Sequence, residues 1–136
     1  MNSIIIYSDH KAFNRYQFWF LAIKQTYSEN SIDWDSVEIA MNEAFNNALL
    51  HGNKNNGLKK IKLSHEINSE KMLQFSVLDE GIGFDLKRTE SFLANKKSDT
   101  VGGRGILFMK SLSEKFSYSI NPSCVELCFP LSCLNL

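Results

Sequence analysis

The pattern of apolar and polar residues predicts helices and strands that follow one another along the chain. Residues 4–7 form a short apolar run typical of a strand, and the pair Ser8-Asp9 offers capping groups for a helix through about Tyr27. A second helix begins at the capping segment 33–36 and runs to Leu50 or His51. Gly52 and Asn53 then supply its stop signal.

The second half of the chain predicts a hairpin, a long loop, a helix and two more strands. Apolar and polar residues alternate on both sides of a short polar turn, as in two antiparallel strands. The segment that follows is rich in glycine and charge, and it is longer than compact domains usually tolerate without a function. The expected ranges are 60–67 and 72–78 for the hairpin, 80–104 for the loop, 105–115 for the helix, and 116–120 and 124–129 for the last strands.

Length and composition favour one soluble globular domain over residues 1–136. With 136 residues the chain is long enough for one core but short of two, and 43% apolar residues are enough to build that core. Fifteen basic residues balance fifteen acidic ones, so we expect no direct binding to nucleic acid. No apolar run is long enough to span a bilayer and no basic region precedes the first apolar stretch, so we expect no membrane partner and a cytoplasmic location.

The second helix carries candidate chemistry beside its apolar stripe. Glu43 and Asn47 are four residues apart and therefore share one flank of the helix. A carboxylate can accept a proton from an attacking hydroxyl, and an amide oxygen suits magnesium. This pair alone favours the interpretation as a solvated helix face, because polar flanks are normal on amphipathic helices.

Two glycine-containing motifs follow at later positions. The strand 73–78 leads into Asp79-Glu80-Gly81-Ile82-Gly83, where the carboxylate can accept a hydrogen bond from an exocyclic amine and the glycines let backbone approach a flat ring. Gly103-Arg104-Gly105 directly precedes an apolar-periodic helix, whose free amides can bind phosphate while Arg104 adds a charge-assisted contact. Each motif alone also fits an ordinary turn or loop, and the second is not a Walker A sequence.

In order and spacing, the three motifs together resemble the N, G1 and G2 boxes of the GHKL (Bergerat-fold) ATPases. The details, Glu43 to Gly52, Gly81 to Asp85 and Gly103 to Ile106, resemble the anti-sigma-factor serine kinases most closely. The resemblance implies an α/β two-layer sandwich, with a mixed and mostly antiparallel sheet, helices on one face, and ATP between the helices and a lid over 86–101.

The resemblance also implies a role for each matching residue. Glu43 would be the general base, Asn47 the Mg²⁺ ligand and Asp79 the carboxylate that reads adenine. The remaining positions would bind the nucleotide: Gly81 and Gly83 as the turn at the base, and Gly103, Arg104 and Gly105 at the phosphates.

The implied activity is phosphorylation of a serine or threonine on an anti-sigma antagonist protein, together with sequestration of a sigma factor. The resemblance also implies that the kinase is a homodimer. The crowding of aromatic side chains at 16–20 fits a first helix that is also buried in an interface, although burial inside one domain explains it too. Two other interpretations remain: a nucleotide-responsive binding module without turnover, and the catalytic domain of a histidine kinase. The latter is disfavoured because the segment before the Glu43 helix is short.

Overall fold

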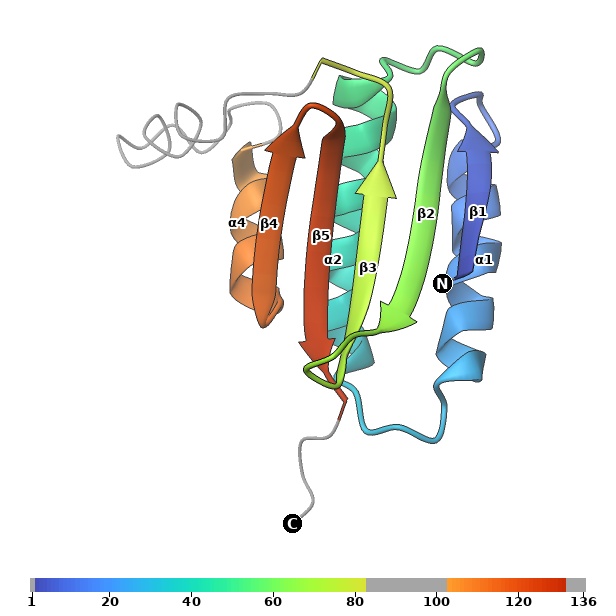
Figure 1. Ribbon diagram of the computed structural model, residues 1–136. Coiled ribbons are helices and arrows are strands. Elements are labelled where there is room, and N and C mark those ends of the chain that lie inside the picture. Colours follow the sequence, from blue (N-terminus) through green and yellow to red (C-terminus); the bar gives the residue numbers. More distant parts are fainter. Residues whose placement is uncertain (1, 83–102, 132–136) are drawn as a thin grey trace.

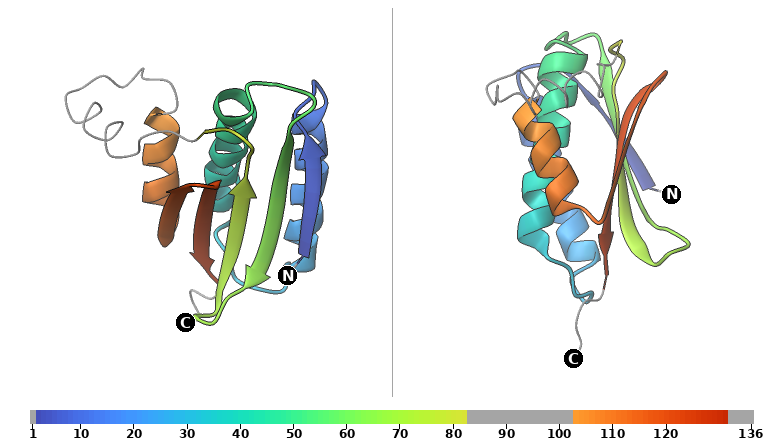
Figure 2. Two further views of the ribbon diagram at one scale, coloured as in Figure 1. Left: turned by 45° about the horizontal axis from the view of Figure 1, so that its top comes forward. Right: turned by 90° about the vertical axis from the view of Figure 1, so that its left-hand side faces the viewer.

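The computed structural model describes residues 2–82 and 103–131, which fold into two layers (Figure 1). One layer is a five-stranded sheet, and the helices pack together on one of its faces, as the edge-on view in Figure 2 shows. In chain order the elements are β1 (Asn2–Tyr7), α1 (Ala12–Thr26), α2 (Trp34–Asn46), the π-helix η1 (Asn47–Gly52), β2 (Lys60–Ile67), β3 (Met72–Leu78), α4 (Gly103–Leu112), β4 (Lys115–Ile120) and β5 (Ser123–Pro130). The expected two-layer α/β sandwich is confirmed.

The sheet has the strand order β1-β2-β3-β5-β4, and every pair of neighbouring strands in the described part of the chain is antiparallel. We expected a mixed, mostly antiparallel sheet. The difference arises from the connections: two helices separate β1 from β2, so the chain reverses direction three times and β2 runs opposite to β1. The hairpins β2–β3 and β4–β5 are antiparallel by construction.

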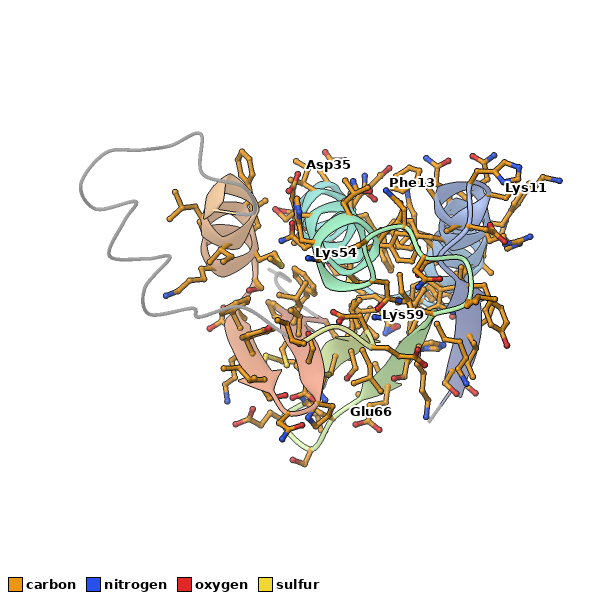
Figure 3. All side chains as sticks on the ribbon, turned by 90° about the horizontal axis from the view of Figure 1, so that it is seen from above. Lys11, Phe13, Asp35, Lys54, Lys59 and Glu66 are labelled. Carbon is orange, nitrogen blue, oxygen red and sulfur yellow. The ribbon has the colours of Figure 1, made fainter. Side chains whose placement is uncertain are left out.

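The core lies between the sheet and the helix layer. The predicted apolar stripe of α2 is buried there, including Val37, Met41 and Phe45. The Phe45 ring stacks on Tyr16 of α1 with ring centroids 4.5 Å apart, and Phe13 lies between the same two helices (Figure 3). This aromatic contact fixes α2 against α1 and leaves the other flank of α2 turned toward α4.

The second helix begins where the sequence predicts but ends differently. Asp33 caps it, accepting a hydrogen bond from the Ser36 amide at 3.2 Å. The α-helical pattern stops at Asn46 and continues as the wider π-helix η1, closed by the Asn53 amide donating to the Ala48 carbonyl at 2.7 Å. π-Turns of this kind are rare and occur frequently at functional sites.

Other boundaries differ by one to three residues: β1 begins at Asn2 rather than residue 4, and α4 spans Gly103–Leu112 rather than 105–115. The lid expected at 86–101, and Gly83 with it, lie outside the described residues. No helix in the described ranges is both long and apolar enough to cross a bilayer.

Candidate nucleotide-binding site

The three sequence motifs meet at one end of the sandwich, the upper end in Figure 1. The α2–η1 helix, the end of β3 and the start of α4 all reach this end, and Figure 3 looks down on it. Motifs separated by more than fifty residues in the sequence therefore contribute to one region.

Asp79 directly follows β3, and hydrogen bonds hold its carboxylate in place. The Gly81 amide donates to Oδ1 at 2.7 Å, and the Ser123 hydroxyl donates to Oδ2 at 3.0 Å. The Asp79 amide in turn donates to the Ser123 carbonyl at 3.0 Å. Burial raises the pKa of Asp79 above its ordinary value of 3.8, and the hydrogen bonds from Gly81 and Ser123 oppose that rise. The site thus contains an oriented, partly desolvated acceptor.

Two glycines, Gly52 and Gly81, allow two backbone segments to approach each other closely beside this carboxylate. A Cβ built on Gly52 would lie 2.5 Å from Asp79 Cγ and 2.6 Å from Oδ1, closer than real Cβ contacts occur. A Cβ on Gly81 would overlap the carbonyl group of Gly52. The end of η1 and the turn after β3 therefore touch through backbone, and no side chain fits between them.

The predicted catalytic flank of α2 faces the glycine of the third motif. A Cβ on Gly105 would lie 2.6 Å from Glu43 Oε1 and 3.2 Å from Asn47 Nδ2. Both side chains are half-buried, whereas Gly105 is buried in the first turn of α4. Glu43 and Asn47 thus share one flank as predicted, and that flank lies beside the amino-terminal end of α4, where helix amides and the dipole favour phosphate.

Asn47 also carries an unsatisfied polar group. Its Nδ2 is buried and has no hydrogen-bond partner within the described ranges. Leaving such a group unpaired costs about 1–3 kcal/mol, so this position favours a polar partner. A half-turn of the amide exchanges its nitrogen and oxygen, so the same position can present either a donor or a metal ligand.

The donor set fits magnesium held mainly by a nucleotide. The described residues contain no group of three or more His, Cys, Asp or Glu side chains that could hold a metal ion. Magnesium commonly takes only one or two protein ligands and completes its shell with phosphate oxygens and water. Asn47, which lies with Glu43 beside Gly105, could supply one such ligand.

Gly103 begins α4 and Arg104 lies in its first turn, which places the backbone of both at the amino-terminal end of this helix. Gly83 lies outside the described residues. His51 is exposed at the end of η1, as befits a residue in a helix-terminal turn.

Sequence reasoning missed two residues of the site, Ser123 and Asn53. Ser123 is 3% exposed and reaches Asp79 from β5, which is 44 residues away in sequence. Asn53 is 1% exposed and bonds to the turn after Asp79, although its position predicted only a helix stop. The available signal was chemical: each is a small polar residue beside a predicted strand or helix end.

This arrangement is a candidate nucleotide-binding site in an α/β sandwich: it combines an oriented carboxylate, an acid and an amide beside a helix start, and glycines between them. The family model for the histidine kinase-like ATPase domain matches residues 13–129, nearly the whole chain. The protein belongs to this family of ATPase domains, within the GHKL superfamily. Comparison with curated proteins found no match.

Proposed function

We propose that this protein is an ATP-dependent serine/threonine kinase of the anti-sigma-factor type, with Mg²⁺ as cofactor. In this proposal it phosphorylates an anti-sigma antagonist protein and sequesters a sigma factor. The supporting observation is the placement of Glu43 and Asn47 against Gly105, at the start of α4, with the buried Asn47 amide lacking a partner in the described residues. An acid beside a phosphate-binding helix start is what transfer to a hydroxyl requires.

In the proposed reaction, Glu43 accepts the proton of the substrate hydroxyl. The oxygen of that hydroxyl forms a bond to the γ-phosphorus. The bond from that phosphorus to the β–γ bridging oxygen breaks, and the electron pair leaves with ADP. Asn47 would hold magnesium, which when bound neutralises charge on the phosphates. Asp79 would accept the amine of adenine, while Gly81 and Gly83 let the backbone turn beside the base. Gly103, Arg104 and Gly105 would contact the phosphates.

A first experiment tests the catalytic assignment. The protein is mixed with γ-labelled ATP and candidate antagonist proteins, and single-turnover transfer is followed alongside ATP affinity. Glu43→Gln should keep ATP affinity but lose about a hundredfold or more in rate, the usual cost of removing a general base. Asn47→Ala should weaken magnesium-dependent ATP affinity as well.

Asp35→Asn is the matched control, since Asp35 is an exposed acid on the same helix but lies in its first turn, two turns before Glu43. Its transfer rate should equal that of the wild type. Equal rates for wild type and Glu43→Gln would refute Glu43 as the base. ATP binding with no transfer to any candidate protein would favour a nucleotide-responsive binding module instead.

We further propose that the protein forms a homodimer through α1. Phe18 and Leu21 are 76% and 56% exposed on this helix, and they border a groove of about 510 Å³ whose floor includes Tyr16 and Phe20. Exposed apolar side chains beside a groove are typical of interfaces. Phe18→Ser should shift the mass measured by analytical ultracentrifugation toward the monomer. Leu58→Ser, at an exposed apolar residue outside this groove, should leave the mass unchanged.

A further inference from the structure

Asn53 is a buried asparagine whose hydrogen bonds connect three parts of the chain. Its Nδ2 donates to the Ser8 hydroxyl at 2.8 Å and to the Lys60 carbonyl at 2.9 Å, and its Oδ1 accepts from the Glu80 amide at 2.8 Å. A flipped amide would set its NH₂ against the Glu80 N–H and its oxygen against the Lys60 carbonyl, so only one orientation satisfies these partners. The orientation of the Asn53 side-chain amide is therefore fixed by its hydrogen bonds.

The partners of Asn53 come from rigid parts of the fold. Ser8 directly follows β1, and its amide donates to the Lys59 carbonyl at 2.9 Å. Lys60 begins β2 and pairs with Tyr7 in the β1–β2 register. The backbone of Asn53 itself closes η1. Asn53 thus connects the turn after Asp79 to the edge of the sheet and to the end of the α2–η1 helix.

That turn is held by three consecutive amides, each with a different acceptor. The Asp79 amide donates to the Ser123 carbonyl, the Glu80 amide to Asn53 Oδ1, and the Gly81 amide to Asp79 Oδ1. The first and third bonds involve β5 and the Asp79 side chain, so Asn53 supplies the contact from the opposite side of the site. Removing Oδ1 would leave the Glu80 amide without this acceptor. The backbone of Glu80, which connects Asp79 to Gly81, would then lose its contact with Asn53.

We propose that Asn53 is a positioning residue for base recognition: by holding the Glu80 amide, it sets the direction in which the Asp79 carboxylate presents itself to a purine amine. This inference rests on the proposed role of Asp79 in reading adenine. Asn53 touches no ligand in this scheme. Its effect passes through the backbone of residues 79–81.

The test compares binding of ATP and inosine triphosphate, whose base carries an oxygen where adenine carries the amine. The wild type should prefer ATP, because the Asp79 carboxylate accepts from an amine and repels an oxo group. Asn53→Ala should weaken ATP binding by about tenfold, roughly one mispaired polar contact, and reduce the preference for ATP. Asn53→Asp retains an acceptor for the Glu80 amide and should keep most of the preference despite lower stability.

Asn68→Ala is the matched control at the other end of the sheet. Asn68 also anchors a turn, since its Oδ1 accepts from the Glu70 and Met72 amides at 2.9 and 3.0 Å. Its replacement should lower the melting temperature without changing nucleotide preference, which separates positioning from general stability. All binding is measured by calorimetry well below the melting temperature of each variant.

The double variant Asn53→Ala with Asp79→Asn makes the test specific. If Asn53 acts through Asp79, adding Asn53→Ala to Asp79→Asn should cost little further affinity for ATP. A wild-type preference for ATP that survives in Asn53→Ala would overturn the inference while leaving the role of Asp79 intact. Absence of any preference in the wild type would refute base reading by Asp79, and the inference with it.

Should Asn53→Ala fail to fold, the wild type still supplies a test by amide hydrogen exchange. The Glu80 amide should exchange slowly in the nucleotide-free protein, since it donates to a buried acceptor. The Lys54 amide, in an exposed turn residue, serves as the fast reference. A Glu80 amide that exchanges as fast as the reference would overturn the inference.

Discussion

The carboxylate of Asp79 lies directly against Gly52, so that a Cβ on residue 52 would come 2.6 Å from Oδ1 and 2.7 Å from Oδ2. This carboxylate has little freedom to move away, because Gly81 and Ser123 donate to its two oxygens. The glycine that the sequence marks as a helix stop is therefore also one wall of the proposed base site. Its lack of a side chain is a requirement of the contact with Asp79.

Gly52→Ala should accordingly weaken ATP binding. The methyl group must displace the Asp79 carboxylate or break its hydrogen bonds, and we expect a loss of about tenfold or more in affinity, the equivalent of one lost polar contact. Calorimetry on the folded variant measures this directly. Gly57→Ala is the control, because a Cβ there meets Asp9 Cβ at an ordinary 3.5 Å. Unchanged affinity in Gly52→Ala would show that Asp79 is not at the base.

The raised pKa of Asp79 predicts a pH dependence of ATP binding. Burial favours the protonated acid in the nucleotide-free protein, whereas an amine donor favours the carboxylate. ATP binding should therefore expel a proton, and affinity should fall as pH is lowered toward and through the raised pKa, above 3.8. Asp79→Asn should bind ATP weakly, and its affinity should not show the fall at low pH that comes from protonation of Asp79. Parallel pH profiles for both proteins would contradict the assignment.

Gly105→Ala should separate stability from activity. Alanine is favoured over glycine within a helix by about 1 kcal/mol, so α4 itself should not be weakened. The new methyl group would nevertheless meet Glu43 Oε1 at 2.6 Å and Asn47 Nδ2 at 3.2 Å. We expect a transfer rate lowered by about tenfold or more, with a melting temperature close to that of the wild type. An unaltered rate would mean that Glu43 does not act from its position beside α4.

Much of the fold followed from local sequence patterns, because alternation and helical periodicity record which side of each element is buried. The stripe on α2 and the cap at Asp33 are examples. The π-turn of η1 was not predictable in this way. It ends at Gly52, whose backbone contacts Gly81, a packing relationship between segments about thirty residues apart.

The residues of the candidate site likewise divide into those predictable from local sequence motifs and those that depend on packing between distant segments. Glu43, Asn47 and Asp79 belong to motifs with recognisable spacing, and the structure puts each beside a glycine of the site. Ser123 and Asn53 carry no such spacing, since their partners are distant in sequence and their importance is a matter of burial and hydrogen-bond geometry. Residues that hold the site residues in place through hydrogen bonds are therefore the hardest to identify from a single sequence.

His65 lies away from these motifs and predicts a pH dependence of stability. It is 5% exposed on β2, with its Nδ1 2.8 Å from the Tyr27 hydroxyl and the Trp19 ring at its edge. Burial lowers the pKa of His65 below its ordinary value of 6.5, with a smaller effect from the positive amino terminus.

The sign of the effect follows from proton linkage. As pH falls below 6.5, the unfolded chain protonates His65 before the native protein does, so the free energy of unfolding decreases through the window from 6.5 down to the lowered native pKa. Above 6.5 this contribution to stability is fully present. Urea unfolding of the wild type and His65→Gln between pH 7.5 and about 5 should show a steeper acid loss in the wild type. His51→Gln, at an exposed histidine, should follow the wild-type curve, and equal slopes for wild type and His65→Gln would refute a neutral, buried His65.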